Sequence, residues 1–265
     1  MKDTMYNQLQ LRELFHLEFL RWFARKIKAK FYALKGGSNL RFFYSSFRYS
    51  EDMDLDIQGV EVDALKDVVM KILQNASFQG MFKAFGCERV TAPDIAKAKQ
   101  TQTTQRFKAH LITSAGEDLF TKIEFSRRGF KGKAVVQGVS DIILRSYKLA
   151  PLLVPHYDAQ STTMQKIDAL VGRPAIQARD VFDLYILSSQ CGPSEIASAP
   201  TASGPRNDRL DRARENLFEV SFEQFRDTVV SYLSLDDQPM YNSSSSWDEI
   251  KLKAANFIEQ LRSRK

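Results

Sequence analysis

A glycine turn followed by an acidic stretch carries the residue types that phosphate chemistry needs. Residues 35–38 read Lys-Gly-Gly-Ser, and residues 50–56 read Ser-Glu-Asp-Met-Asp-Leu-Asp. Backbone N–H groups at a helix start bind anions, and glycines let a phosphate approach the backbone closely. We therefore predict a phosphate site at Gly36, Gly37 and Ser38, with the Ser38 hydroxyl as a donor to a phosphate oxygen. Taken alone, a Gly-Gly-Ser turn is more often purely structural.

The acidic stretch predicts a site for a divalent cation. Residues 52–60 alternate between polar and apolar side chains, which is typical of a strand. Asp52 and Asp54 then point to one face, ~6–7 Å apart, and carboxylate oxygens are the ligands that Mg²⁺ prefers. Asp56 shares that face but lies ~13 Å from Asp52, so we expect a solvated or indirectly acting charge there. The alternative is an edge strand whose charged face opposes aggregation. Mutual repulsion of the carboxylates favours the cation site.

A third carboxylate is expected from a neighbouring strand. In residues 121–126 the apolar side chains alternate with Lys122, Glu124 and Ser126. Glu124 could complete a metal triad or act as the general base on an attacking hydroxyl. An ordinary solvent-facing glutamate fits the same pattern equally well.

The elements that position these residues are mixed α and β at first and helical later. Hydrophobic spacing and turn residues predict helices and strands. The expected helices are 6–29, a short one capped by Ser38, 61–75, 164–171, 179–187, 217–235 and 247–261. The expected strands are 31–34, 52–60, 105–113, 118–126 and 134–139, the third and fourth forming a hairpin. We predict an α+β domain over residues 1–150 and a helical domain over residues 151–265, with a flexible loop at 191–208.

Composition limits the class of protein. The chain has 38 Lys and Arg against 32 Asp and Glu, a net charge of +6. Basic stretches at residues 21–30 and 127–133 fit either an RNA backbone or solvated surfaces. No apolar run approaches the ~18 residues that would span a membrane, and no signal peptide is evident. Two cysteines and three scattered histidines argue against a disulfide framework or a zinc site. We expect a cytoplasmic protein.

Three segments together resemble the AbiEii family, the nucleotidyltransferase-like toxins of abortive-infection and type IV toxin–antitoxin systems, whose relatives include the MenT toxins. They are residues 35–38, residues 48–55 and the later run with Lys166, Arg173 and residues 179–184. The first two match the Gly-Ser…Asp-x-Asp pattern of polymerase-β-like enzymes. The resemblance implies a polymerase-β-like nucleotidyltransferase core with a mixed sheet, followed by a helical C-terminal portion.

The resemblance also assigns roles to individual residues. Ser38 matches the phosphate-binding serine, and Asp52 and Asp54 match the metal ligands. Lys166 matches a lysine of the helical segment, where it would contact triphosphate oxygens as a point charge. Asp180 or Asp183 matches the aspartate of the arginine–aspartate motif, with Asp180 favoured.

Other interpretations of the helical residues stay open. Lys166 could lie on a solvated helix face, which is the commoner place for a lysine. Asp180 and Asp183 could form a structural ion pair with Arg173. Residues 172–175 read Gly-Arg-Pro-Ala and interrupt the helix where the family keeps a basic residue, so the sequence departs from the family pattern there.

The implied activity is Mg²⁺-dependent transfer of a nucleoside monophosphate from a nucleoside triphosphate (NTP) to an acceptor, for some relatives the tRNA 3′ end, which would block translation. Two metal ions would bridge Asp52, Asp54 and the triphosphate while pyrophosphate leaves. A cognate antitoxin, often a winged-helix DNA-binding protein, is also implied. The alternatives are a protein or small molecule as acceptor, or a non-catalytic module that binds nucleic acid or an antitoxin. The general base and the choice of NTP stay open.

Overall fold

The computed structural model describes residues 6–190, 192 and 206–262, which form two compact units. The first unit comprises Met1–Phe43, Tyr49–Phe130 and Ala134–His156. The second comprises Tyr44–Arg48, Lys131–Lys133 and Tyr157–Lys265. The division that the sequence suggests, at residue 150, stays a prediction.

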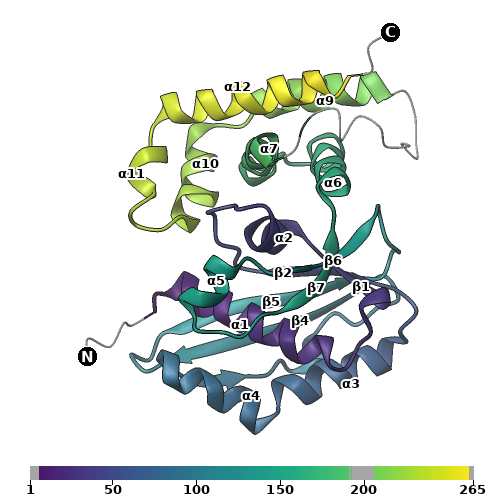
Figure 1. The fold of residues 1–265 in the computed structure, drawn as a ribbon, viewed down its shortest axis with the longest axis vertical. Helices are drawn as coiled ribbons and strands as arrows, with labels where there is room; N and C mark the ends of the chain where they lie inside the picture. Colours follow the sequence, from purple (N-terminus) through teal and green to yellow (C-terminus); the bar gives the residue numbers. More distant parts are fainter. Residues whose placement is uncertain (1–5, 191, 193–205, 263–265) are drawn as a thin grey trace. The chain divides into compact units, whose positions relative to one another are not determined.

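A mixed sheet forms the centre of the first unit (Figure 1). Among the described residues it has seven strands in the order β3-β4-β5-β2-β1-β7-β6. β1 pairs antiparallel with β2, β2 pairs parallel with β5, and β5 pairs antiparallel with β4. The strands are β1 (Tyr32–Lys35), β2 (Met53–Ile57), β3 (Cys87–Thr91), β4 (Thr104–Thr113), β5 (Asp118–Ser126), β6 (Ala134–Gly138) and β7 (Leu153–Tyr157).

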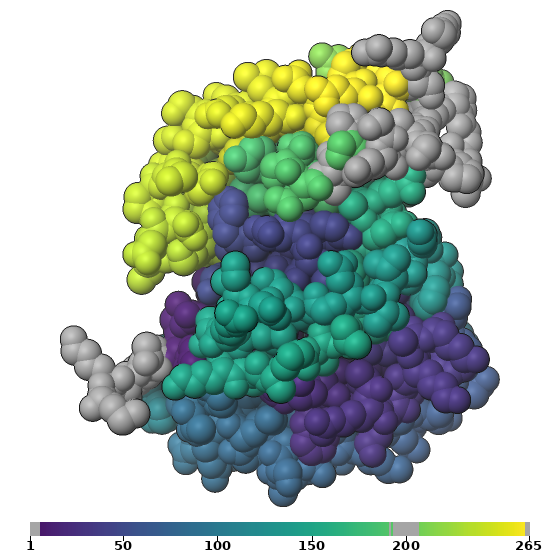
Figure 2. All heavy atoms as spheres, in the orientation of Figure 1, coloured from purple at the N-terminus to yellow at the C-terminus, as the bar shows by residue number. Residues whose placement is uncertain are grey.

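The two faces of this sheet differ because side chains alternate along each strand. On β5 the apolar set Leu119, Ile123 and Phe125 is buried, and Lys122 and Glu124 between them are only partly buried. The apolar face packs against α1 (Gln8–Ala24), whose Phe23 contacts the Phe125 ring. The helices α3 (Val62–Leu73) and α4 (Ala76–Met81) lie beside α1 on this side (Figures 1 and 2).

Two further helices complete the first unit. β1 runs directly into α2 (Gly36–Phe43), which lies over the opposite face of the sheet in Figure 1, and α5 (Asp141–Ser146) follows β6. Single turns of 3₁₀ helix occur at Ala29–Phe31, Phe82–Phe85 and Ile95–Lys97.

Helices make up the second unit. They are α6 (Ala159–Gly172), α7 (Ala178–Gln190), α9 (Arg206–Phe218), α10 (Phe222–Thr228), a 3₁₀ turn (Val230–Tyr232), α11 (Gln238–Tyr241) and α12 (Ser244–Gln260). Their core is aromatic. Phe225 stacks on Trp247 at 4.3 Å between ring centroids and packs against Phe182 of α7. The Trp247 indole N–H donates to the Val220 carbonyl, so the buried ring is also satisfied as a donor.

The predicted α+β class is confirmed, and so is the hairpin of β4 and β5. Three details are wrong. Ser38 does not cap α2, because the helix already begins at Gly36. The single helix expected over 217–235 is instead the end of α9, then α10 and a 3₁₀ turn, because the chain breaks after Phe218 and again at Val229. Strands β3 and β7 were not expected.

The loop expected at 191–208 lies largely outside the described residues, and its last part begins α9.

A buried ion pair joins α1 to α2 within the first unit. The Arg41 guanidinium donates to both carboxylate oxygens of Glu13, at 2.6 and 3.2 Å, and the Tyr147 hydroxyl donates to Glu13 at 2.7 Å. Arg41 also lies over the Tyr49 ring at 4.2 Å. Burial opposes the charge on Arg41, but Glu13 outweighs burial and raises the pKa of the guanidinium. This pair fixes the far end of the helix that starts at the glycine turn.

The variant Glu13→Gln should lose about 3 kcal/mol of unfolding free energy, because it leaves the Arg41 charge partly buried and without its carboxylate. Denaturant unfolding measures this. The double variant Glu13→Gln, Arg41→Met should lose less than the two single variants added together. Additive losses would contradict the interaction.

Candidate active site

Charged side chains form a row across four strands on the polar face of the sheet. Lys35 of β1 is the register partner of Asp54, Asp54 is the partner of Glu124 on β5, and Glu124 is the partner of Arg106 on β4. Directly paired residues lie on the same face of a sheet. The structure therefore brings together Asp54 and Glu124, which the sequence proposed as members of one metal site.

Each cation of this row binds a carboxylate. Arg106 donates to Glu124 at 2.6 Å, and the Lys35 ammonium lies 2.5 Å from Asp56. Asp56 is 2% exposed, so the expectation of a solvated charge is wrong at that position. The other prediction for Asp56, a charge that acts indirectly, agrees with the structure, because Asp56 binds Lys35, the register partner of Asp54.

Asp54 lies where negative charge accumulates. Burial raises the pKa of its carboxyl, and the neighbouring carboxylates of Glu124 and Asp52 raise it further, against the opposing effect of Lys35 and Lys122. Repulsion from the neighbouring carboxylates therefore adds to the effect of burial at Asp54. A bound cation would reduce this repulsion.

Gly36 allows α2 to start against Asp54. Its backbone has φ of +70°, and an added Cβ would lie 2.8 Å from the Asp54 carboxylate oxygen Oδ2. Both the left-handed conformation and the close approach require glycine. The predicted phosphate site at the start of α2 thus lies beside Asp54, a residue of the predicted cation site.

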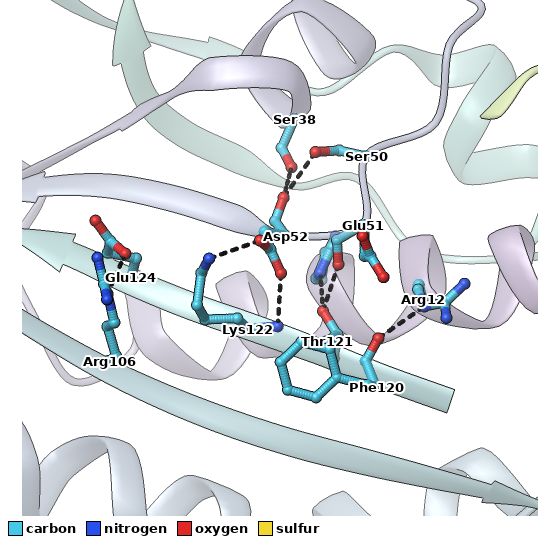
Figure 3. A network of polar contacts seen from close by, with 11 residues as sticks. Arg12, Ser38, Ser50, Glu51, Asp52, Arg106, Phe120, Thr121, Lys122 and Glu124 are labelled. Carbon is cyan, nitrogen blue, oxygen red and sulfur yellow. Dashed lines mark hydrogen bonds and ion pairs between the residues drawn. The ribbon is translucent and has the colours of Figure 1, made fainter. Parts of the chain in front are cut away.

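Asp52 lies just before the β2 ladder and is held by side chains and backbone instead (Figure 3). Its carboxylate accepts from the Lys122 backbone N–H at 3.1 Å, and the Lys122 ammonium lies 2.7 Å from its other oxygen. Its carbonyl accepts from the hydroxyls of Ser50 at 2.7 Å and Ser38 at 3.3 Å. Ser38 is 1% exposed, so its hydroxyl here positions Asp52.

A hydrogen-bond chain from α1 supports the same segment. The Thr121 hydroxyl donates to the Glu51 carbonyl at 2.7 Å (Figure 3), and His16 Nε2 lies 2.8 Å from that hydroxyl. Burial, with a smaller contribution from Arg12, lowers the pKa of His16 to about 3, so the ring is neutral at pH 7. Because the single Thr121 proton goes to Glu51, His16 must donate from Nε2.

The donor set of this face suits a hard divalent cation, since it consists of carboxylates. Asp52, Asp54 and Glu124 are the residues that could hold one. Within the residues that the structure describes, however, no group of three His, Cys, Asp or Glu side chains is close enough to form a metal site. Lys122 and Arg106 hold two of the three acids.

The second unit contains a separate buried cluster around Lys166. Its ammonium lies 3.0 Å from Asp180 and 2.5 Å from Asp183, and Asp183 also binds Arg48 at 3.2 Å. Arg173 binds Asp180 at 2.7 Å. Lys166 is 8% exposed, which contradicts a solvated lysine. Asp180 and Asp183 both contact Lys166, so this geometry does not separate their roles, and the proposed ion pair with Arg173 is present.

Charges inside the cluster stabilise each other. Burial by itself would raise the pKa of Asp183, but Lys166 and Arg48 outweigh it and lower the pKa. Burial would lower the pKa of Lys166, and Asp183 and Asp180 reverse this and raise it. Lys166 and Asp183 therefore stay ionised at neutral pH.

The chain matches the family described as nucleotidyl transferase AbiEii toxin, type IV toxin–antitoxin system, over residues 18–248. It belongs to the AbiEii family. The protein is thus a nucleotidyltransferase of a toxin family. Comparison with curated proteins gives no match.

Solved structures share the fold of this AbiEii protein. MenT4, a nucleotidyltransferase toxin from Mycobacterium tuberculosis, superposes with a TM-score of 0.63 at 13% identity, covering 95% of this chain and 84% of that one. JHP933 from Helicobacter pylori gives 0.59 at 17% identity, covering 97% and 93%. The predicted nucleotidyltransferase fold is confirmed. No helix among the described residues is long and apolar enough to cross a membrane.

Several residues of the site were missed from the sequence. Lys35, Lys122 and Arg106 hold acids of the polar face, and Arg48 joins the Lys166 cluster. A signal for Arg106 existed, because residues 106–110 alternate charged or polar side chains with apolar ones. Arg48 lies in the run 48–55 that carries the family resemblance, but this run does not reveal its partner Asp183, which lies 135 positions away along the chain.

The variant Gly36→Ala should lose about 1–3 kcal/mol of unfolding free energy, because a Cβ at this φ is strained and meets Asp54. Thermal and denaturant unfolding measure the loss. Gly80→Ala is the matched control, since Gly80 lies in α4 with open space around it, and it should be neutral or slightly stabilising. Equal effects of the two variants would contradict the close approach.

Acid should weaken the second unit through Asp183. Its folded-state pKa lies below the unfolded value of about 3.9, so its contribution is complete above that value and is lost as the pH falls through it and below. Unfolding free energy measured between pH 7 and pH 2 should decline as the pH falls below about 4. The decline should be shallower in Asp183→Asn, and identical slopes would contradict the assignment.

Proposed function

We propose that this protein transfers a nucleoside monophosphate from an NTP to an RNA acceptor, the tRNA 3′ end, and thereby blocks translation. The family supports the transferase activity, and the observation that carries the site is the approach of Gly36 at the start of α2 to Asp54. A helix start suits a phosphate and adjacent carboxylates suit a cation. Few other reactions need both side by side.

In this proposal Asp52 and Asp54 hold Mg²⁺, with Glu124 as a third ligand or as the general base. The metal would neutralise charge on the triphosphate. An acceptor hydroxyl forms a bond to the α-phosphorus, the bond between that phosphorus and the oxygen bridging to the β-phosphate breaks, and pyrophosphate leaves. If Glu124 is the base, it takes the hydroxyl proton. Gly36 and Gly37 let the phosphates approach the backbone.

Lys166 and Asp180 remain proposed catalytic residues on the strength of the resemblance. A lysine held by two aspartates is oriented as well as charged, which suits a contact to phosphate oxygens. Asp180 or Asp183 would then act by positioning Lys166.

The proposed setting is the cytoplasm, where NTPs and tRNA are present. A cognate antitoxin follows from the family, and a winged-helix DNA-binding protein is the proposed type. Exposed basic residues Arg25, Lys26, Lys28 and Lys30 provide one surface in the first unit for an RNA backbone.

Transfer is tested by incubating the protein with Mg²⁺, each α-labelled NTP in turn and total tRNA. Label should enter tRNA with the unaltered protein, and periodate oxidation of the tRNA, which destroys the 3′ diol, should abolish it. Asp54→Asn should reduce the rate about 100-fold or more, because a charge that neutralises the metal is lost. Asp63→Asn is the surface control, since the Asp63 side chain is 84% exposed.

Label on protein or on a small molecule would support those acceptors instead. Absence of transfer to any acceptor, with RNA or antitoxin binding unchanged in Asp54→Asn, would support a non-catalytic module.

A further inference from the structure

The Lys122 ammonium forms an ion pair with the carboxylate of Asp52, which is one of the two proposed metal ligands. It lies 2.7 Å from Asp52 Oδ2, and the side chains are 25% and 28% exposed. Figure 3 shows Lys122 extending along the sheet surface to Asp52. A divalent cation and this ammonium therefore compete for the same oxygen.

Of the two partners, Lys122 is the one free to move. The backbone of Glu51 and Asp52 is held by Thr121, Ser50 and Ser38, and the Lys122 backbone N–H binds the second carboxylate oxygen of Asp52. The Asp52 carboxylate is thus fixed. The lysine ammonium, by contrast, sits at the end of a four-carbon stem with rotatable bonds.

We propose that Lys122 is a resident counter-cation that keeps divalent metal off Asp52 until nucleotide arrives. This inference rests on the proposed function. Without nucleotide, the lysine neutralises Asp52 and repels an incoming metal. When nucleotide binds, the ammonium moves from Asp52 to the triphosphate, and the metal that is bound to the triphosphate binds Asp52. Both cations then have an anionic partner. Lys122 thereby couples metal binding to nucleotide binding.

Removing the lysine has opposite effects on the two ligands. Lys122→Met keeps the stem without the charge, so Mn²⁺ alone should bind about tenfold tighter or more. Binding of a non-hydrolysable NTP analogue with Mn²⁺ should weaken several-fold, because the ammonium no longer meets the phosphates. Lys122→Gln should behave like Lys122→Met, and Lys122→Arg should stay close to the unaltered protein.

Bound Mn²⁺ is measured by the loss of the free-ion electron paramagnetic resonance signal, a readout independent of activity. Lys108→Met is the matched control. Lys108 is the register partner of Lys122 on β4 and is exposed, with its ammonium over the Phe120 ring at 5.4 Å. Its variant should shift Mn²⁺ affinity less than twofold. Unfolding curves establish that each variant is folded.

Unchanged or weaker Mn²⁺ binding in both Lys122→Met and Lys122→Gln would overturn the proposal. So would an equal tightening in Lys108→Met, because the effect would then be general surface charge. If transfer to RNA still occurs, only the lysine proposal has failed. If no variant binds Mn²⁺ with or without nucleotide, the proposed function fails as well.

Discussion

The parallel pairing of β2 with β5 is the constraint on which the candidate active site depends. Its register sets Asp54 beside Glu124 and Met53 beside Ile123. Because side chains alternate, a slip of one residue would turn the acids towards the α1 side and the apolar residues outward. Burial of Met53, Leu55 and Ile57 therefore fixes the register, and the position of the acids follows from the packing of their apolar neighbours.

Asp52 shows how the site extends beyond the ladder. It precedes β2, so no regular strand pairing holds it. Its position depends on the hydroxyls of Ser38 and Ser50, which donate to its carbonyl, and on that of Thr121, which donates to the carbonyl of the preceding residue. The neutral ring of His16 is hydrogen-bonded to the Thr121 hydroxyl. A protonated His16 in this buried position would carry an uncompensated charge, and burial keeps it neutral. The apolar core thereby contributes directly to the geometry of a charged site.

The sequence predicts the parts of the site that depend on local pattern. Period-two alternation places Asp54 and Glu124 on the polar face of the sheet, and the glycine pair marks the close approach at Gly36. Local pattern does not reveal which cation meets which acid. Lys35 binds Asp56 although it is the register partner of Asp54, a choice made by side-chain reach after the strands have paired. Strand β3 was missed because its buried positions do not alternate with period two, and β7 because Pro155 interrupts its apolar run.

The charged clusters of the two units affect the pKa of their acids in opposite directions. On the polar face of the sheet, burial and the neighbouring carboxylates of Glu124 and Asp52 raise the pKa of Asp54. In the second unit, Lys166 and Arg48 outweigh burial and lower the pKa of Asp183.

A charge that has lost solvation without a sufficient counter-charge is costly for stability alone. The raised pKa of Asp54 marks such a position on the polar face of the sheet, where a cation would reduce the repulsion between neighbouring carboxylates. In the second unit, by contrast, Lys166 and Arg48 already supply counter-charges to Asp183, so this carboxylate stays ionised in the cluster by itself.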